Sequence, residues 1–123
     1  MFSSKGVTGR IINPPSNAVA EVGGQAIFNC TSDTTAQSWI FSTNREEYET
    51  STGQTIVAGC IVQTGFTSDY EVDRPGGTNN VCNLVIRTVS VQQAGVYTCS
   101  DDAPGPSAIL TVIGRYNRAN VLS

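Results

Sequence analysis

The stretch Ala94-Gly95-Val96-Tyr97-Thr98-Cys99 carries the strongest structural signal in this sequence. A tyrosine two residues before a cysteine, preceded by a small residue in a turn, is typical of a tyrosine corner, in which the phenol hydroxyl hydrogen-bonds back to the main chain. Such a corner requires a second cysteine roughly 60 to 75 residues upstream and a tryptophan between the two cysteines. Cys30 and Trp39 meet these requirements. The stretch therefore predicts a strand whose cysteine points into a core between two sheets.

The sequence on both sides continues this pattern. Leu84, Ile86 and Val89 precede the corner at a spacing that fills the core beneath it, and Leu110-Thr111-Val112-Ile113 follows as a last strand. Together these residues resemble an immunoglobulin domain of the variable type (V-set), over about residues 9 to 114. The resemblance implies an all-β fold, an immunoglobulin-like V-type β-sandwich of two antiparallel sheets with Greek-key connections.

The resemblance also divides the chain and identifies its core. Residues 1–8 are expected to be an N-terminal extension, residues 9–114 the domain, and residues 115–123 a linker or tail. The core signature is expected to consist of Trp39, Leu84, Ile86 and Tyr97.

Length and composition fit one such domain. A chain of 123 residues can bury well over half of the surface that its unfolded form exposes. Charged residues make up 14%, below the average of about a quarter, and the net charge is −3. A nucleic-acid binder needs a basic stripe to displace counterions from phosphate, so no nucleic-acid partner is expected.

Four cysteines in so small a chain indicate an oxidising compartment, and we expect an extracellular domain, either secreted or part of an ectodomain. Residues 1–8 contain no apolar run long enough for a signal peptide, and no stretch approaches the roughly 18 apolar residues of a membrane span. We therefore expect an excised fragment without its leader or any anchor, making no membrane contact of its own.

Alternation of apolar and polar residues, with turn residues between, predicts the remaining strands. Because proline cannot donate to a β-ladder, Pro14-Pro15 belongs at an edge where the first strand passes from one sheet to the other. Cys60-Ile61-Val62 is either a short strand or a loop. The expected strands are residues 10–13 with 16–21, 26–30, 38–42, 55–58, 70–72 and 81–86.

Four cysteines allow three pairings. The resemblance implies a Cys30–Cys99 bridge, which leaves Cys60 to pair with Cys82. Such a second bridge closes a loop of about 23 residues, which stabilises by on the order of 3 kcal/mol in the chain-entropy model. The alternative, a redox or metal pair, lacks CxxC spacing and has no histidine to assist it.

The absence of histidine removes most catalytic mechanisms, because no side chain is left with an ordinary pKa near neutrality to act as a base. We expect no enzyme activity and no cofactor. Asp69, Asp73, Asp101 and Asp102 do not alternate as calcium-loop ligands do, so no metal site is expected.

Function is then expected to lie in a surface. The resemblance implies that one face contacts a partner, with Ile40 and Ile109 near its centre; this face is built from the expected strands at residues 38–42 and 55–58, the strand that carries Cys99 and the last strand. Isolated exposed apolar residues are also normal on protein surfaces, so this remains one of two interpretations. The residues expected to contact a partner are Ile40, Thr98, Ser100, Ile109 and Thr111, with Asp101 and Asp102 at the rim.

The chain departs from the family pattern at two places. The last strand resembles an antigen-receptor joining segment, but of its two glycines only Gly105 is kept, and Ser107 replaces the second. This puts antibody-style pairing in doubt, since those glycines permit the bulge that sets it. Gln93 stands where the family usually places an aspartate, so Arg74 is expected to lack its usual partner.

Asn29-Cys30-Thr31 fits the N-glycosylation pattern, although its middle residue belongs to the expected core bridge.

Two functions stay open. The first is the recognition domain of an immune-type receptor that binds a protein or a microbial surface ligand. The alternative is a homophilic adhesion module that dimerises through the same face.

Overall fold

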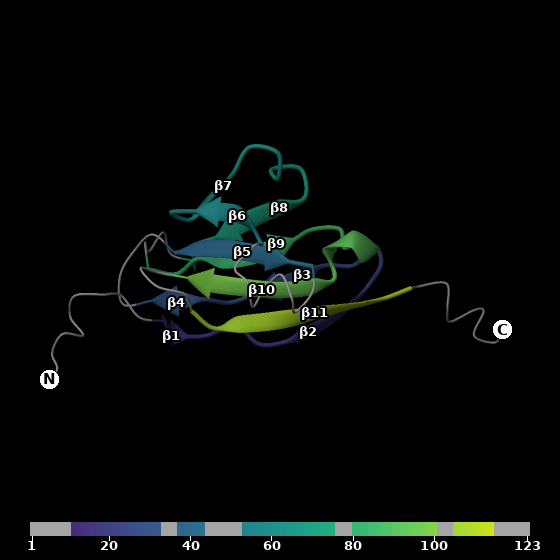
Figure 1. Cartoon of the computed structure of the whole chain (residues 1–123), viewed down its shortest axis with the longest axis horizontal. Coiled ribbons are helices and arrows are strands. Elements are labelled where there is room, and N and C mark those ends of the chain that lie inside the picture. The colour runs from purple at the N-terminus through teal and green to yellow at the C-terminus, as the bar shows by residue number, and fades with distance from the viewer. Residues whose placement is uncertain (1–10, 33–36, 44–52, 76–79, 101–104, 115–123) are drawn as a thin grey trace, which may run out of the picture.

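The structure is a computed structural model of the chain, and it describes residues 11–32, 37–43, 53–75, 80–100 and 105–114. Figure 1 shows two layers of strands, with β1 and the C-terminal end of β11 at opposite sides of the domain. The front sheet has six strands in the order β2-β11-β10-β5-β6-β7. The back sheet has three strands, in the order β3-β9-β8, and β1 pairs with β4. This all-β arrangement is an immunoglobulin-like β-sandwich and confirms the predicted fold class.

The strand bounds agree with the predicted positions to within a few residues. The strands are β1 (Ile11–Asn13), β2 (Ala18–Glu21), β3 (Ala26–Phe28), β4 (Thr31–Ser32), β5 (Ser38–Ser42), β6 (Gln54–Ala58), β7 (Ile61–Val62), β8 (Tyr70–Asp73), β9 (Asn83–Ile86), β10 (Gly95–Ser100) and β11 (Ser107–Ile113). The 3-10 turn η3 (Val91–Gln93) precedes β10. Among the described residues no helix is both long and apolar enough to cross a membrane.

The first strand does cross between the sheets at Pro14-Pro15. Before the prolines β1 pairs antiparallel with β4, and after them β2 pairs with β11 in the front sheet. The β2–β11 pairing is parallel, whereas the other strand pairs of the two layers are antiparallel. After the prolines the chain keeps its direction as it passes to the front sheet. There β2 runs in the same direction as β11, so the two strands form a parallel pair.

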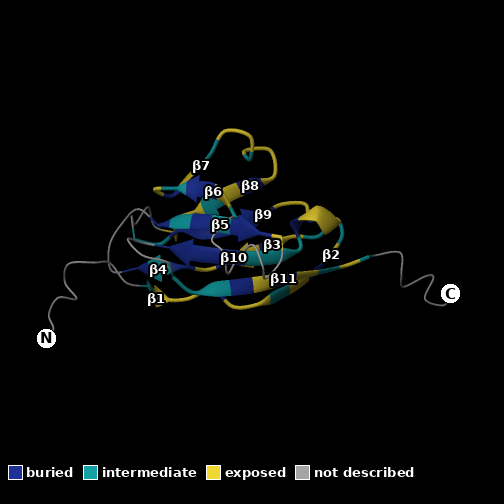
Figure 2. Cartoon of the chain, viewed as in Figure 1, coloured by how far each residue is buried: buried dark blue, intermediate teal, exposed yellow. Residues whose placement is uncertain are grey.

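The core forms from side chains that alternate inward from both sheets. Phe28 on β3 lies between Trp39 and Tyr97 of the front sheet, with ring centroids 6.2 Å and 5.1 Å away. All three side chains are almost fully buried, as are Leu84 and Ile86 on β9. Figure 2 shows the buried segments concentrated on the middle strands of the two layers.

The tyrosine corner has the expected geometry. The Tyr97 hydroxyl donates to the main-chain oxygen of Gln93 at 2.7 Å. Its oxygen is left to accept from the Tyr70 hydroxyl, 3.2 Å away on β8 of the opposite sheet. Burial raises the pKa of both phenols above their ordinary value, so both hydroxyls remain protonated donors. The corner therefore ties η3 to both sheets.

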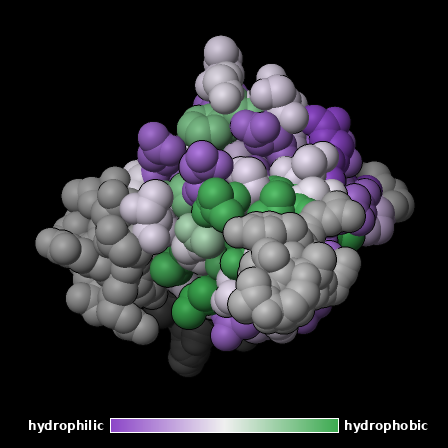
Figure 3. All heavy atoms as spheres, turned by 90° about the vertical axis from the view of Figure 1, so that its right-hand side faces the viewer, coloured by the Kyte–Doolittle hydropathy of each residue, from purple (hydrophilic) through white to green (hydrophobic). Residues whose placement is uncertain are grey.

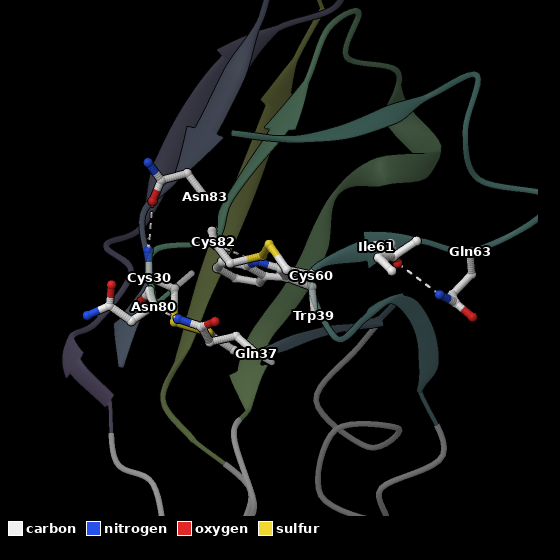
Figure 4. The surroundings of a disulfide bond; sticks show 10 residues. Cys30, Gln37, Trp39, Cys60, Ile61, Gln63, Asn80, Cys82 and Asn83 are labelled. Atoms are coloured by element: carbon white, nitrogen blue, oxygen red, sulfur yellow. Dashed lines mark hydrogen bonds between the residues drawn. A yellow bond between two sulfur atoms is a disulfide. The ribbon is translucent and has the colours of Figure 1, made fainter. Parts of the chain in front are cut away.

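Two disulfides join the sheets, Cys30 to Cys99 and Cys60 to Cys82. The main-chain N–H of Cys82 donates to the Cys30 carbonyl at 3.0 Å, so the two bridges are anchored side by side on the back sheet. The Trp39 indole N–H donates to the Cys82 carbonyl at 3.0 Å, and Figure 4 shows its ring against the Cys60–Cys82 bridge. Each bridge thus packs against the same tryptophan-centred core.

The Cys60-Ile61-Val62 segment is partly turn and partly strand. Gly59 and Cys60 both have φ of 60°, and they form the two-residue turn between β6 and β7. Two positive φ values suit the hairpin turn that matches strand twist. Cys60 therefore has a backbone conformation that glycine adopts more readily. Its main-chain N–H donates a hydrogen bond to the main-chain carbonyl of Gln37 at 2.8 Å.

Candidate protein-interaction face

The candidate site is the outward side of the front sheet, here called the front face. Trp39 and Phe41 on β5 are buried in the core, which places Ile40 between them on the front face. On β11 the buried residues Ala108 and Leu110 place Ile109 on the same face. These orientations agree with the sequence prediction.

Ile40 and Ile109 are separated by strand β10. Ile40 is opposite Thr98 of β10, and Ile109 is opposite Val96. Two strand spacings separate β5 from β11, about 10 Å across the sheet. Ile40 is half-buried between Thr98 and Thr55, whereas Ile109 is 43% exposed. Of the two isoleucines, Ile109 offers the larger apolar surface.

Thr98 and Ser100 do not present the exposed hydroxyls that alternation predicted. They are only 6% and 8% exposed. Thr98 lies on a central strand between Ile40 and Ser107, and its hydroxyl is 2.9 Å from that of Ser107. Strand alternation fixes the side on which a residue lies, whereas neighbouring side chains decide its exposure. Neither hydroxyl therefore contributes much surface to a partner.

An apolar ridge that alternation had only partly predicted runs along the β2–β11 edge. Its members are Val19 on β2, 69% exposed, with Ile109 and Ile113 on β11. Thr111 lies between the two isoleucines, is exposed as predicted, and pairs with Val19. Ile113 has the same parity as Ile109, so the sequence could have supplied it. The place of Val19 in the ridge could not be predicted from the sequence. It depends on the parallel pairing of β2 with β11, and the residues on either side of Val19 are only small alanines.

Hydrogen bonds at the ridge fix its edge. The side-chain oxygen of Asn17, just before β2, accepts a hydrogen bond from the main-chain N–H of Ile109 at 2.8 Å. Asn17 thus provides the hydrogen-bond partner of this N–H group on β11. At the other end the main-chain N–H of Val22 donates a hydrogen bond to the main-chain carbonyl of Ile113 at 2.9 Å. The ridge thus lies on paired backbone at both of its ends. A surface held in this way loses little conformational entropy when a partner binds.

Apolar exposure is not confined to the front face. Ile27 on the back sheet is 50% exposed, and Ile61 on β7 and Val91 in η3 are also exposed. Figure 3 views the end of the domain that carries η3 and the C-terminal end of β11, where apolar side chains gather near the middle. What distinguishes the ridge is that its three residues lie on two directly paired strands.

The remaining sequence-predicted residues lie elsewhere. Asp101 and Asp102 fall outside the described residues. Asn29 is exposed on the back sheet, while Cys30 beside it is fully buried in its disulfide. A glycan on Asn29 would therefore project from the sheet opposite the front face.

The polar residues near β8 also differ from the family pattern. Gln93 is buried, and its side-chain oxygen accepts from the Ser90 main-chain N–H at 2.8 Å. Arg74 is exposed and forms no ion pair with any residue that the structure describes. Arg87 instead pairs with Glu71 at 3.4 Å, and both side chains are about half exposed. A surface pair of this kind stabilises by at most about 1 kcal/mol.

Within the described ranges no three His, Cys, Asp or Glu side chains gather as a metal site requires. All four cysteines are in disulfides, so none is available as a nucleophile.

The sequence matches no protein-family model and no curated protein. Several solved structures nevertheless have the same fold. The RIG-5 IG1 homodimer has a TM-score of 0.67 at 21% identity, over 85% of this chain and 96% of that chain. Dpr1 IG1 bound to DIP-eta IG1 has a TM-score of 0.66 at 15% identity, over 85% of this chain and 95% of that chain. The ZIG-8 IG1 homodimer has a TM-score of 0.63 at 20% identity, over 85% of both chains.

Proposed function

We propose that this immunoglobulin-fold domain is a non-catalytic, extracellular recognition module that binds another protein through its front face. The observation that carries the proposal is the apolar ridge of Val19, Ile109 and Ile113, whose exposed polar neighbours are Thr111 within it and Glu21 at its end. An apolar centre within a polar rim is the usual anatomy of a protein interface. The two disulfides support an oxidising, extracellular location.

The partner favoured by the comparisons is another immunoglobulin domain. Among the similar structures, Dpr1 IG1 is bound to DIP-eta IG1, a complex between two different IG1 domains. The narrower form of the proposal is an immune-type receptor domain whose protein partner lies on another cell or on a microbe. Binding of the purified domain to a panel of immunoglobulin domains, cells and microbes separates these versions.

Homophilic adhesion is the second candidate. It is favoured by the RIG-5 and ZIG-8 IG1 structures, which are homodimers. A self-complementary interface requires a patch that can pack against its own copy, and the ridge offers branched apolar side chains on the edge strand β2 and its neighbour β11. Light scattering coupled to size-exclusion chromatography, over a series of protein concentrations, tests for the dimer.

Replacing Ile109 by Asp is expected to abolish partner binding or self-association while leaving the fold intact. Ile109 is 43% exposed and outside the core, so the charge stays solvated in the free domain. In the complex the carboxylate would be buried without a partner, which costs several kcal/mol, or more than about 100-fold in Kd. Light scattering measures self-association, and surface plasmon resonance measures binding to each partner found in the panel.

The matched control is Ile27 replaced by Asp. Ile27 is the same residue type, is 50% exposed, and lies on the back sheet. Its replacement should leave binding unchanged and the thermal midpoint within a few degrees of the parent. If the Ile27 variant loses binding while the Ile109 variant binds normally, the partner surface is the back sheet and the front-face assignment is wrong.

A further inference from the structure

A cleft of about 310 Å³ lies at the end of the domain near η3. Four separate parts of the chain line it: Phe41 near the end of β5, Gln54 at the start of β6, the turn that leads into β8, and the residues around η3. The turn supplies Phe66, Asp69 and Tyr70 to the lining. Figure 1 shows this turn and η3 at the same end of the domain. All of the lining residues are among those that the structure describes.

The turn into β8 places its three lining side chains on one side. The main-chain N–H groups of Asp69 and Tyr70 both donate to the Phe66 carbonyl, at 3.2 Å and 3.0 Å. This is one helical turn, in which residues i, i+3 and i+4 share a face. Phe66, Asp69 and Tyr70 have that spacing, so an aromatic ring, a carboxylate and a second ring are presented together.

The opposite side of the turn is held by Arg87. Its guanidinium donates to the carbonyls of Thr67 and Ser68, at 3.3 Å and 3.1 Å, and pairs with Glu71. These contacts fix the turn without placing the guanidinium in the lining of the cleft. The walls of the cleft therefore carry no basic group of their own.

The walls combine aromatic rings with one carboxylate. Tyr70 and Phe41 are nearly buried and form the floor, whereas Phe66 is half-buried and forms a wall. The Phe66 and Tyr70 ring centroids are 6.2 Å apart and their planes are inclined at 60°, so the rings form a corner. Asp69 is exposed at this corner, and Gln92 and Gln93 add uncharged amides. Aromatic faces attract cations, and a carboxylate accepts hydrogen bonds from them.

We propose that this cleft binds the guanidinium group of an arginine side chain from a partner protein. A guanidinium is planar and weakly hydrated, stacks on an aromatic ring, and donates two parallel hydrogen bonds to a carboxylate. Phe66 supplies the ring and Asp69 the carboxylate. An ammonium group fits this corner less well, because it is a compact and strongly hydrated point charge. The site is separate from the front face and does not depend on the function proposed for that face.

The test is an NMR titration of the ¹⁵N-labelled domain with Nα-acetyl-arginine methylamide at constant ionic strength. The amide signals of Phe66, Asp69, Tyr70 and Gln92 should shift and saturate at millimolar probe. The citrulline analogue has almost the same shape without the charge, and it should cause no saturating shift. The lysine analogue should bind several-fold more weakly than the arginine probe.

Two variants locate the site. Asp69 replaced by Asn should weaken the arginine probe by about fivefold, the loss expected for an exposed ion pair. Asp73 replaced by Asn is the matched control, because Asp73 is also an exposed carboxylate on the β8 segment but does not line the cleft. Its affinity for the probe should not change. Phe66 replaced by Leu should weaken binding about threefold through loss of the ring.

Several results would overturn the proposal. Equal shifts with citrulline exclude recognition of a cation, and equal affinity for the lysine probe excludes recognition of the guanidinium. Equal losses in the Asp69 and Asp73 variants reduce the effect to general surface charge. Ile109 replaced by Asp should leave the titration unchanged, so failure at the front face and failure at the cleft can be told apart.

Discussion

Replacing Cys30 and Cys99 together by alanine is expected to lower the free energy of unfolding by about 4 to 5 kcal/mol. The two cysteines are 69 residues apart, so their bridge removes a large loop-closure entropy from the unfolded chain. A domain of this size has a total stability of about 5 to 15 kcal/mol, so the double variant should be marginal at 37 °C. Denaturation by urea at 25 °C, followed by tryptophan fluorescence, measures the change.

The pair Cys60 and Cys82 provides the comparison. Its bridge spans only 22 residues, and replacing both cysteines by alanine should cost about 3 kcal/mol. Both pairs are almost fully buried, so the packing lost is similar and the loop length is the main difference. A larger loss for the Cys60 and Cys82 variant would show that local packing around Trp39, rather than chain entropy, determines how much each bridge stabilises.

Replacing Gly95 by alanine is expected to destabilise the domain by about 3 kcal/mol or more. Gly95 opens strand β10 with a φ of 154°, which other residues rarely adopt. An added Cβ would lie 2.5 Å from the carbonyl oxygen of Ser42 and 2.9 Å from the Phe41 ring. Backbone strain and overpacking each cost about 1 to 3 kcal/mol, and here both apply. The midpoint of urea denaturation reports the change.

Gly59 replaced by alanine is the matched control. Gly59 also has a positive φ, 60°, but an added Cβ would meet no atom within 4 Å. Only the backbone preference is lost there, about 1 to 2 kcal/mol. Equal losses at the two glycines would mean that the strand pairing of β10 with β5 relaxes enough to accept the methyl group, against the close packing inferred at Gly95.

Sequence patterns, through their resemblance to a variable-type immunoglobulin domain, were sufficient to predict the sandwich itself. The Tyr97 and Cys99 spacing, with Trp39 and Cys30 upstream, predicted the corner, and alternation predicted that Trp39, Leu84 and Ile86 are buried. These features depend on the two-residue period of a strand and on hydrogen bonds between residues close in sequence, such as Tyr97 to Gln93. For the same reason the outward orientation of Ile40 and Ile109 could be predicted.

The exposure of individual side chains and the shape of the surface were decided only by the tertiary structure. Ser42 and Thr98 have outward parity yet are buried, Ser42 because Gly53 approaches so closely that a Cβ there would meet its hydroxyl. The ridge at Val19 exists because β2 crosses over to pair with β11, and the cleft exists because β5, β6, the turn into β8 and η3 converge. Alternation is a property of one strand, whereas a surface is made by segments distant in sequence. The sequence alone therefore determined which residues face inward, and the folded chain decided which of the others a partner can reach.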